Sequence, residues 1–494
     1  MNDNIFQHFF DAKQNHAARF IETAAGAVLS YADVFNLSGQ IANVLIAEGL
    51  KPDDRVAAQV EKSVAALALY LAVVRCGAIF LPLNTAYTDV EMAYFLSDAE
   101  PSILICDPAR APTLSNNAFK TLTLSASNSG TLIDIAKLQD PYFATVHRSL
   151  DDLAAILYTS GTTGKSKGAM LSHGNLLSNA KSLVKIWHFT AADILIHALP
   201  TYHTHGLFVA TNTIMLAGAS MIYLPKFDAD KIIDLMPRAT TLMGVPTFYT
   251  RLLEHPELNP DRVKNIRLFI SGSAPLLAET HKAWSEKTGH AILERYGMTE
   301  TNMNSSNPYE GERIAGSVGF PLPDVDIRID GDAGGIGVIE IKGPNVFKGY
   351  WRLPEKTAAE FREGYFISGD LGRFDSHGYL HIVGRSKDLV ITGGLNVYPI
   401  EIENEIDGID GVLESAVIGL PHKDFGEGVT AIVVRNSNST VSESEIKNQL
   451  DVRLAKFKQP KAIIFVNELP RNAMGKVQKN ILRQTYENYY ATKF

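Results

Sequence analysis

The residues from 158 to 168, YTSGTTGKSKG, gather glycines, hydroxyl groups and lysines into one short loop. Glycines let backbone N–H groups approach oxygen atoms, hydroxyls donate hydrogen bonds, and lysines supply positive charge, so the loop has what a polyphosphate site needs. The residues with these properties are Thr159, Ser160, Gly161, Thr162, Thr163, Gly164, Lys165 and Lys167. It is not the P-loop pattern, because two residues rather than four separate its glycines. The alternative is a flexible surface loop, which seldom combines so many hydroxyls with paired lysines.

Five further segments follow along the chain: SGSAPL (271–276), ERYGMTE (294–300), ISGDLG (367–372), GRSKDLVITGG (384–394) and PRNAMGK (470–476). Each has an ordinary explanation when taken singly. A glutamate such as Glu300 after a threonine commonly begins a helix, a turn aspartate such as Asp370 commonly caps a glycine, and Lys476 fits a solvated basic tail.

With the loop, these six segments in this order resemble the adenylate-forming superfamily of acyl-CoA synthetases, luciferases and peptide-synthetase adenylation domains. The resemblance covers nearly the whole chain. Two positions depart from the family pattern: Ser166 stands where proline is usual in the loop, and Asn472 stands where threonine is usual in the last motif. Neither departure removes a charged group.

The resemblance implies ATP, Mg²⁺ and coenzyme A as the molecules that the site handles. The residues that it assigns to ATP or AMP, besides the loop, are Gly272, Ser273, Ala274, Tyr296, Gly297, Thr299, Asp370 and Arg385. Tyr296 offers a face for adenine, Asp370 accepts from the ribose hydroxyls, and Glu300 holds Mg²⁺. Lys476 stabilises the charge that builds up when a carboxylate attacks the α-phosphate. The resemblance also implies a pivot at Lys387 and a path for the CoA thiol beside Gly393 and Gly394.

Two histidines, His203 and His205, occur in LPTYHTHGLF. Metal ligation is one interpretation of this spacing, but no carboxylate or cysteine lies nearby in the sequence to complete a site. A structural role for either ring is another. The resemblance implies that His203 lies beside the acyl-adenylate as a catalytic residue and that His205 lines the acid pocket.

Arg251 and Arg295 are cations in segments where the family's fatty-acid and aromatic-acid enzymes have no need of one. A dicarboxylate needs one carboxylate free to react and the other held by a guanidinium, so the arginines, with Ser271, predict an acid site for a small diacid. The stretch from 297 to 319 resembles the malonyl-CoA synthetases of the family, which implies malonate as the acid. The alternatives are methylmalonate or a short fatty acid as substrate, a surface salt bridge for Arg251, and a neighbouring acid as partner of Arg295.

These motifs must be positioned by an α/β fold. Up to about residue 385, short apolar runs alternate with helical patterns such as 64–75 and 175–187, which is typical of wound α/β sheets. Residues 325–349 favour a smaller β lobe, and the last hundred residues a mobile α+β unit. We expect an adenylation domain at residues 1–386 and a C-terminal domain at 387–494 that carries Lys476.

Composition excludes several classes of protein. The 494 residues carry a net charge of −8, which argues against nucleic-acid and anionic-membrane partners. The partners that the resemblance implies are malonate, ATP and CoA. Both cysteines, Cys76 and Cys106, lie in apolar runs, which favours buried thiols and a cytoplasmic location. The family resemblance also suggests that a lysine acetyltransferase acts on Lys476. Two rivals remain open: a luciferase or carrier-protein adenylation domain, and a non-catalytic nucleotide-binding protein.

Overall fold

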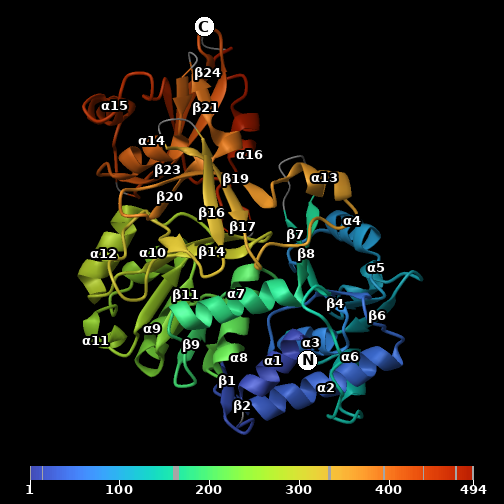
Figure 1. Ribbon diagram of the computed structural model, residues 1–494. Helices are drawn as coiled ribbons and strands as arrows, with labels where there is room; N and C mark the ends of the chain where they lie inside the picture. The colour runs from blue at the N-terminus through green and yellow to red at the C-terminus, as the bar shows by residue number, and fades with distance from the viewer. Residues whose placement is uncertain are drawn as a thin grey trace.

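The computed structural model describes residues 2–13, 15–159, 166–331, 335–392, 395–437, 439–472 and 475–491. Figure 1 shows a large body, coloured from blue to yellow, and a smaller unit above it in orange and red that contains the last part of the chain. The predicted α/β architecture with a smaller C-terminal unit is therefore confirmed.

The largest sheet of the body has nine strands, and its central six are parallel. In spatial order the nine strands are β15 (Phe320–Pro321), β14 (Asn302–Ser306), β13 (Leu293–Met298), β12 (Leu268–Ser271), β11 (Thr241–Gly244), β9 (Ile194–His197), β10 (Ser220–Tyr223), β1 (Arg19–Thr23) and β2 (Val28–Ser30), and the six parallel ones run from β13 to β1. Parallel strands end at one edge of a sheet, so Ser271 and the loop after His197 come out on the same side.

A second sheet of six strands lies beside the first. Its order is β6 (Lys120–Thr123), β5 (Ile103–Cys106), β3 (Arg55–Gln59), β4 (Ile79–Pro82), β7 (Leu153–Thr159) and β8 (Lys167–Ser172). All neighbours are parallel except β7 and β8, which form an antiparallel pair with Thr159 opposite Lys167. The loop at residues 158–168, which the sequence predicts to bind a polyphosphate and which we call the phosphate-type loop, thus connects two paired strands.

Helices cover the faces of these sheets (Figure 1). They are α1 (Ile5–Ala12), α2 (Tyr31–Ala47), α3 (Val64–Arg75), α4 (Asp89–Ala99), α5 (Ala111–Leu114), α6 (Thr131–Ala136), α7 (His173–Ile186), α8 (Thr213–Ala217), α9 (Ala229–Leu235), α10 (Pro246–Leu253), α11 (Pro260–Val263), α12 (Ala278–Thr288) and α13 (Pro354–Ala359), with a π-helix η1 (His205–Asn212) and a 3₁₀ turn η2 (Met236–Arg238). α3 is apolar along its length and buried on every side, as expected of an interior helix.

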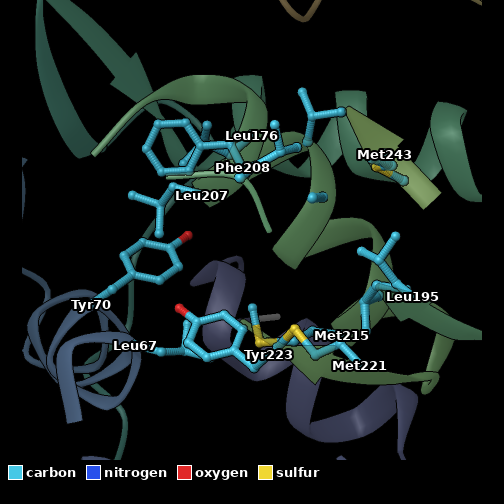
Figure 2. Packing of buried hydrophobic residues seen from close by; sticks show 14 of the residues in the cluster. Leu67, Tyr70, Leu176, Leu195, Leu207, Phe208, Met215, Met221, Tyr223 and Met243 are labelled. Carbon is cyan, nitrogen blue, oxygen red and sulfur yellow. The ribbon is translucent and has the colours of Figure 1, made fainter. Parts of the chain in front are cut away.

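The main core joins the two sheets. Figure 2 shows part of it, where Leu67 and Tyr70 of α3 meet Leu207 and Phe208 of η1 and Tyr223 of β10. Cys76 and Cys106 are both fully buried, as predicted. Helix α3 therefore packs the second sheet against η1, which follows the segment with His203 and begins at His205.

The β lobe extends further than its sequence pattern predicts, because ISGDLG and GRSKD also lie in or next to its strands. Its strands are β16 (Asp326–Gly331), β17 (Gly337–Lys342), β18 (Phe361–Arg362), β19 (Tyr365–Phe374) and β20 (Leu380–Arg385). β19 and β20 are antiparallel neighbours, and Asp370 lies opposite Arg385. The expected end at residue 349 was wrong because Gly-rich turns interrupt the alternating pattern between the strands.

The C-terminal unit has its own mixed sheet with apolar side chains on both faces. It comprises η3 (Ser386–Asp388), β21 (Val390–Thr392), β22 (Leu395–Val397), α14 (Pro399–Asp407), β23 (Val412–His422), β24 (Gly426–Arg435), α15 (Glu443–Asp451), β25 (Ala462–Val466) and α16 (Lys479–Thr485). Along β24, Val429, Ala431 and Val433 belong to one cluster and Ile432 and Val434 to the other, which is the two-residue period of a strand buried on both faces.

Candidate active site

Three side chains from different motifs meet where the β lobe contacts the large sheet. The hydroxyl of Tyr296, on β13, donates to Asp370 Oδ2 at 2.6 Å, and Arg385 Nε lies 2.9 Å from Asp370 Oδ1. Burial and the neighbouring Asp370 carboxylate raise the pKa of Tyr296 well above its usual value. The buried carboxylate is thus fixed by one hydrogen bond and one ion pair, and it is the group that the family resemblance assigns to ribose.

Glu300 lies in a second cluster, in the turn between β13 and β14. Its Oε1 accepts from the hydroxyl of Tyr350 at 3.1 Å and from Thr159 Oγ1 at 3.4 Å. Burial is the main reason that the pKa of Glu300 is raised. The Tyr350 hydroxyl also reaches Glu360 at 2.7 Å, and Lys167 Nζ lies 3.0 Å from Glu360 and 4.0 Å from the centre of the Tyr350 ring. Carboxylate, hydroxyl and ammonium groups therefore converge at the ends of the phosphate-type loop.

Several predicted residues lie outside the described part of the chain. They are Ser160, Gly161, Thr162, Thr163, Gly164 and Lys165 of the loop, and Gly393 and Gly394 of the predicted CoA path. Both ends of the loop are described, since Thr159 and Lys167 form a register pair.

Lys476 reaches this site from the C-terminal unit. Burial, followed by the charge of Arg385, lowers the pKa of Lys476 to about 8, while the carboxylates of Asp370 and Glu300 oppose that shift. Burial and the Lys476 charge lower the pKa of His203 to about 3, so this ring is neutral at pH 7. The lysine thus lies within electrostatic reach of both carboxylate clusters.

The turn that presents Lys476 is closed by Asn472. Asn472 Oδ1 accepts from the Lys476 backbone N–H at 3.0 Å, and the Asn472 N–H donates to the Lys476 carbonyl at 2.9 Å. An asparagine side chain is well suited to such local bonds, so the departure from threonine preserves the turn.

Arg295 is the most deeply buried cation of the site. It is only 3% exposed, and its Nε and Nη2 have no hydrogen-bond partner within the described residues. The hydroxyl of Ser271 and the Nε2 of His205 are also buried without a partner there. A Cβ on Gly272 would lie 2.4 Å from Arg295 Cζ, so only glycine leaves room for the guanidinium. These groups can donate hydrogen bonds, and together they suit a carboxylate.

Burial lowers the pKa of Arg295 to about 9. The adjacent Glu294 does not neutralise it, because side chains alternate across strand β13 and Glu294 accepts from the Leu276 N–H instead. Burial raises the pKa of Glu294 to about 8. The structure therefore does not support the alternative in which Arg295 pairs with the neighbouring acid, Glu294.

The turn after β12 contains the other predicted small residues. Ser273 has a φ of +74°, and its hydroxyl lies 3.1 Å from His205 Nδ1. Ala274 and Thr299 are partly exposed. Gly297 lies against the next strand, where an added Cβ would be 2.0 Å from the Asn302 carbonyl oxygen. These residues form one edge of the region around Tyr296.

The expectation that Arg251 lies in a water-poor pocket is wrong. Arg251 is exposed on α10, with its guanidinium 5.8 Å from the ring centre of Phe227. Tyr249 and Leu252 occupy the buried face of this helix. Arg251 lies between these two inward-facing positions, so its side chain points outward from the helix. Its occurrence in the predicted acid-pocket segment was therefore not enough to predict that it is buried.

Lys387 lies in η3, between β20 and β21, at the junction of the β lobe and the C-terminal unit. Its neighbour Asp388 forms an ion pair of 2.7 Å with Arg483 of α16. Burial lowers the pKa of Lys387.

Tyr350 and Glu360 are site residues that the sequence did not single out. Tyr350 forms an isolated bridge with Ala169 of β8, and this pairing brings its hydroxyl to Glu300. Nothing in their spacing relates either residue to Glu300, so only the three-dimensional arrangement identifies them.

Two features of the described residues concern membranes and metal ions. No helix there is long and apolar enough to cross a membrane. No group of three or more His, Cys, Asp and Glu side chains within that part of the chain is arranged to hold a metal ion by itself.

Comparison with known proteins relates this geometry to a family. The model of the AMP-binding enzymes matches residues 7–351, and that of the AMP-binding enzyme C-terminal domain matches residues 401–476. A malonate–CoA ligase of Arabidopsis thaliana is 36% identical over 453 residues, covering 83% of this chain and 74% of the relative.

Two crystal structures of MatB from Rhodopseudomonas palustris are 60% identical to this chain, and each comparison covers 99% of this chain and 100% of MatB. The TM-score is 0.97 against the ATP-bound structure and 0.86 against the apo structure. The arrangement described above is therefore more similar to the ATP-bound one. From the two family models, which together span both units, the chain belongs to the AMP-binding enzyme family.

Proposed function

We propose that this chain ligates malonate to coenzyme A at the expense of ATP, forming malonyl-AMP and pyrophosphate first and then malonyl-CoA and AMP. The observation that carries the proposal is Arg295, a buried guanidinium with two unpartnered donors beside Ser271 and His205. A monocarboxylic substrate has no second charge to meet such a cation. The similarity to a malonate–CoA ligase supports the same acid.

In the first step, an oxygen of one malonate carboxylate attacks the α-phosphorus of ATP, and the bond from that phosphorus to pyrophosphate breaks. Two anions approach each other, so positive charge at the reacting centre lowers the barrier. Lys476 supplies it, because its ammonium interacts with both Asp370 and Glu300. Arg295 holds the other carboxylate away from the phosphates.

The residues around Glu300 fit Mg²⁺. A buried carboxylate with a raised pKa and a nearby threonine hydroxyl gains a compensating charge when a divalent cation binds. Glu300 would hold the ion, with Thr159 near it, and Mg²⁺ would neutralise phosphate charge. Lys167 would turn from Glu360 toward the phosphates.

Asp370 and Tyr296 orient the nucleoside. Asp370 has its two oxygens fixed by Tyr296 and Arg385, so the remaining lone pairs are directed for ribose hydroxyls. The turn at Gly272, Ser273 and Ala274, with Gly297 and Thr299, borders the adenine side. A nucleoside held in this way would direct its α-phosphate toward Lys476.

In the second step, the CoA sulfur attacks the acyl carbon, the thiol proton leaves, and AMP departs. We propose that the C-terminal domain, residues 387–494, turns about Lys387 between the steps, so that Lys476 withdraws and the segment with Gly393 and Gly394 approaches. The different TM-scores against ATP-bound and apo MatB, 0.97 and 0.86, support such a change of arrangement. His203, neutral at pH 7, can orient the acyl group or the thiol without adding charge.

Two finer points belong to the proposal. A lysine acetyltransferase is a suitable partner for Lys476, because a pKa near 8 leaves part of the amine unprotonated and nucleophilic. A cytoplasmic location is favoured by the two unpaired thiols, Cys76 and Cys106.

The test is a pyrophosphate-release screen over malonate, methylmalonate, succinate, propionate and butyrate, with and without CoA. Malonate should give the highest kcat/KM, and CoA should be required for turnover to AMP. A preference for propionate or butyrate would replace malonate with a short fatty acid, and release without any thioester product would favour an adenylation domain of another type.

A further inference from the structure

Lys62 is a buried lysine that the proposed mechanism does not use. It lies between β3 and α3, next to Ser63, whose side chain caps α3. Its exposure is 9%, and burial lowers its pKa well below the usual value for a lysine. Burying an ammonium is costly unless hydrogen bonds replace its water. The contacts of Lys62 therefore need a physical reason.

The ammonium finds three acceptors on one segment of the large sheet. Lys62 Nζ lies 2.8 Å from His197 Nδ1, 2.8 Å from the His197 carbonyl oxygen and 2.9 Å from the Leu199 carbonyl oxygen. The centre of the Tyr223 ring lies 4.2 Å from Lys62 Nζ. An ammonium has three N–H donors, so each has a partner. Figure 2 shows the apolar setting of Tyr223, beside Leu67.

The contact with Lys62 also determines how His197 bonds on its other side. Nδ1 faces Lys62 Nζ, and the Gly206 carbonyl on the other side of the ring can only accept, so the proton of the neutral ring is on Nε2. That nitrogen lies 2.9 Å from the Gly206 carbonyl oxygen and 3.2 Å from Thr211 Oγ1, and Thr211 donates to the same carbonyl at 2.8 Å. Burial and the Lys62 charge lower the pKa of His197, which keeps the ring neutral.

The network therefore holds both ends of the segment 199–206. Lys62 binds the Leu199 carbonyl at its start, and His197 binds the Gly206 carbonyl at its end. The two ends touch, since a Cβ on Gly206 would lie 2.0 Å from the Pro200 carbonyl oxygen. Between them the segment carries His203 and His205.

We propose that Lys62 is a positioning residue that fixes the segment 199–206 and, through it, His203 and His205 at the acid site. This inference rests on the proposed function for the consequence in catalysis, but not for the bonding of His197. Lys62 touches no reacting atom, and it acts through the two carbonyls and the His197 ring. A small displacement of groups that orient a substrate lowers turnover strongly.

The first test compares Lys62→Met with Lys13→Met. Lys13 is a matched control, because its Nζ also donates to a backbone carbonyl, that of Gly218, at 2.6 Å, and lies over a tyrosine ring, Tyr31, at 5.3 Å. Lys62→Met should lower kcat for adenylation by roughly tenfold or more with the KM for ATP within about twofold, whereas Lys13→Met should stay within about twofold in both. Equal losses in the two variants would overturn the proposal.

The second test needs no substrate, so it separates this inference from the malonate assignment. NMR of histidine labelled with the heavy nitrogen isotope reports which ring nitrogen carries the proton, and a His197→Gln variant assigns the signal. Lys62→Met should shift the Nδ1 signal of His197, while Lys13→Met should not. An unchanged His197 signal in Lys62→Met would refute the network.

A milder variant covers the case in which Lys62→Met does not fold. Thr211→Val keeps the shape of the side chain and removes only the hydroxyl that bonds to the Gly206 carbonyl. It should lower kcat by a few-fold and leave the KM for ATP unchanged. A rate equal to wild type in Thr211→Val would count against control of the segment through Gly206.

Discussion

Replacing Arg295 with methionine should separate substrate binding from stability. In the free protein the guanidinium is buried with Nε and Nη2 unpartnered among the described residues, and each unsatisfied buried donor costs roughly 1–3 kcal/mol. Methionine removes those donors and has a similar length. We therefore expect the thermal midpoint of the ligand-free Arg295→Met variant to stay the same or rise.

Activity toward malonate should change in the opposite direction. Without Arg295 the second carboxylate enters a buried site unpaired, at a cost of roughly 2–5 kcal/mol. At about 1.4 kcal/mol per decade, kcat/KM for malonate falls by roughly thirty-fold to several-thousand-fold. Propionate and butyrate carry no second charge, so their kcat/KM should be unchanged or higher.

The assay is pyrophosphate release with malonate and butyrate, beside thermal unfolding of the same preparations. Arg251→Met is the matched control, because Arg251 is an exposed arginine on α10 and its replacement should change malonate kcat/KM by less than about tenfold. A fall for both acids together with a lower thermal midpoint would make Arg295 a structural residue and remove the main support for a diacid.

The other predictions concern the two steps and their pH dependence. Lys476→Ala should suppress adenylation and spare thioester formation from supplied malonyl-AMP, and equal loss in both half-reactions would refute this division. For wild type, kcat/KM for adenylation should decline as pH rises through about 8, since the ammonium of Lys476 is present below its pKa and lost above it; a profile flat to pH 10 would contradict this. Lys387→Pro should leave adenylation intact and slow thioester formation, because proline fixes φ where the proposed rotation occurs, and wild-type rates in both would place the pivot elsewhere. Tyr296→Phe removes a hydrogen bond to a carboxylate worth about 1.5 kcal/mol, so the KM for ATP should rise roughly tenfold, and an unchanged KM would mean that Asp370 needs no such support.

Much of the fold follows from local patterns. The apolar, glycine-free run at 64–75 specifies a buried helix, and α3 has those bounds. The apolar contexts of Cys76 and Cys106 correctly predict burial. The order of the six motifs is sufficient for family membership, because each motif is a short segment whose residue types are set by its chemistry.

Other features depend on packing between distant segments, which a local pattern cannot encode. Arg251 and Arg295 are alike as cations in the sequence, but a helix turns one outward while a strand of the sheet buries the other beside Gly272. Tyr350 and Glu360 join the Glu300 cluster only through the pairing of Tyr350 with Ala169. Lys62 meets His197, 135 residues away, only because the two sheets pack together. The sequence by itself thus determined which chemistry is present, whereas the tertiary structure decided which charges lose their water, because burial is a property of the packed chain and not of any segment.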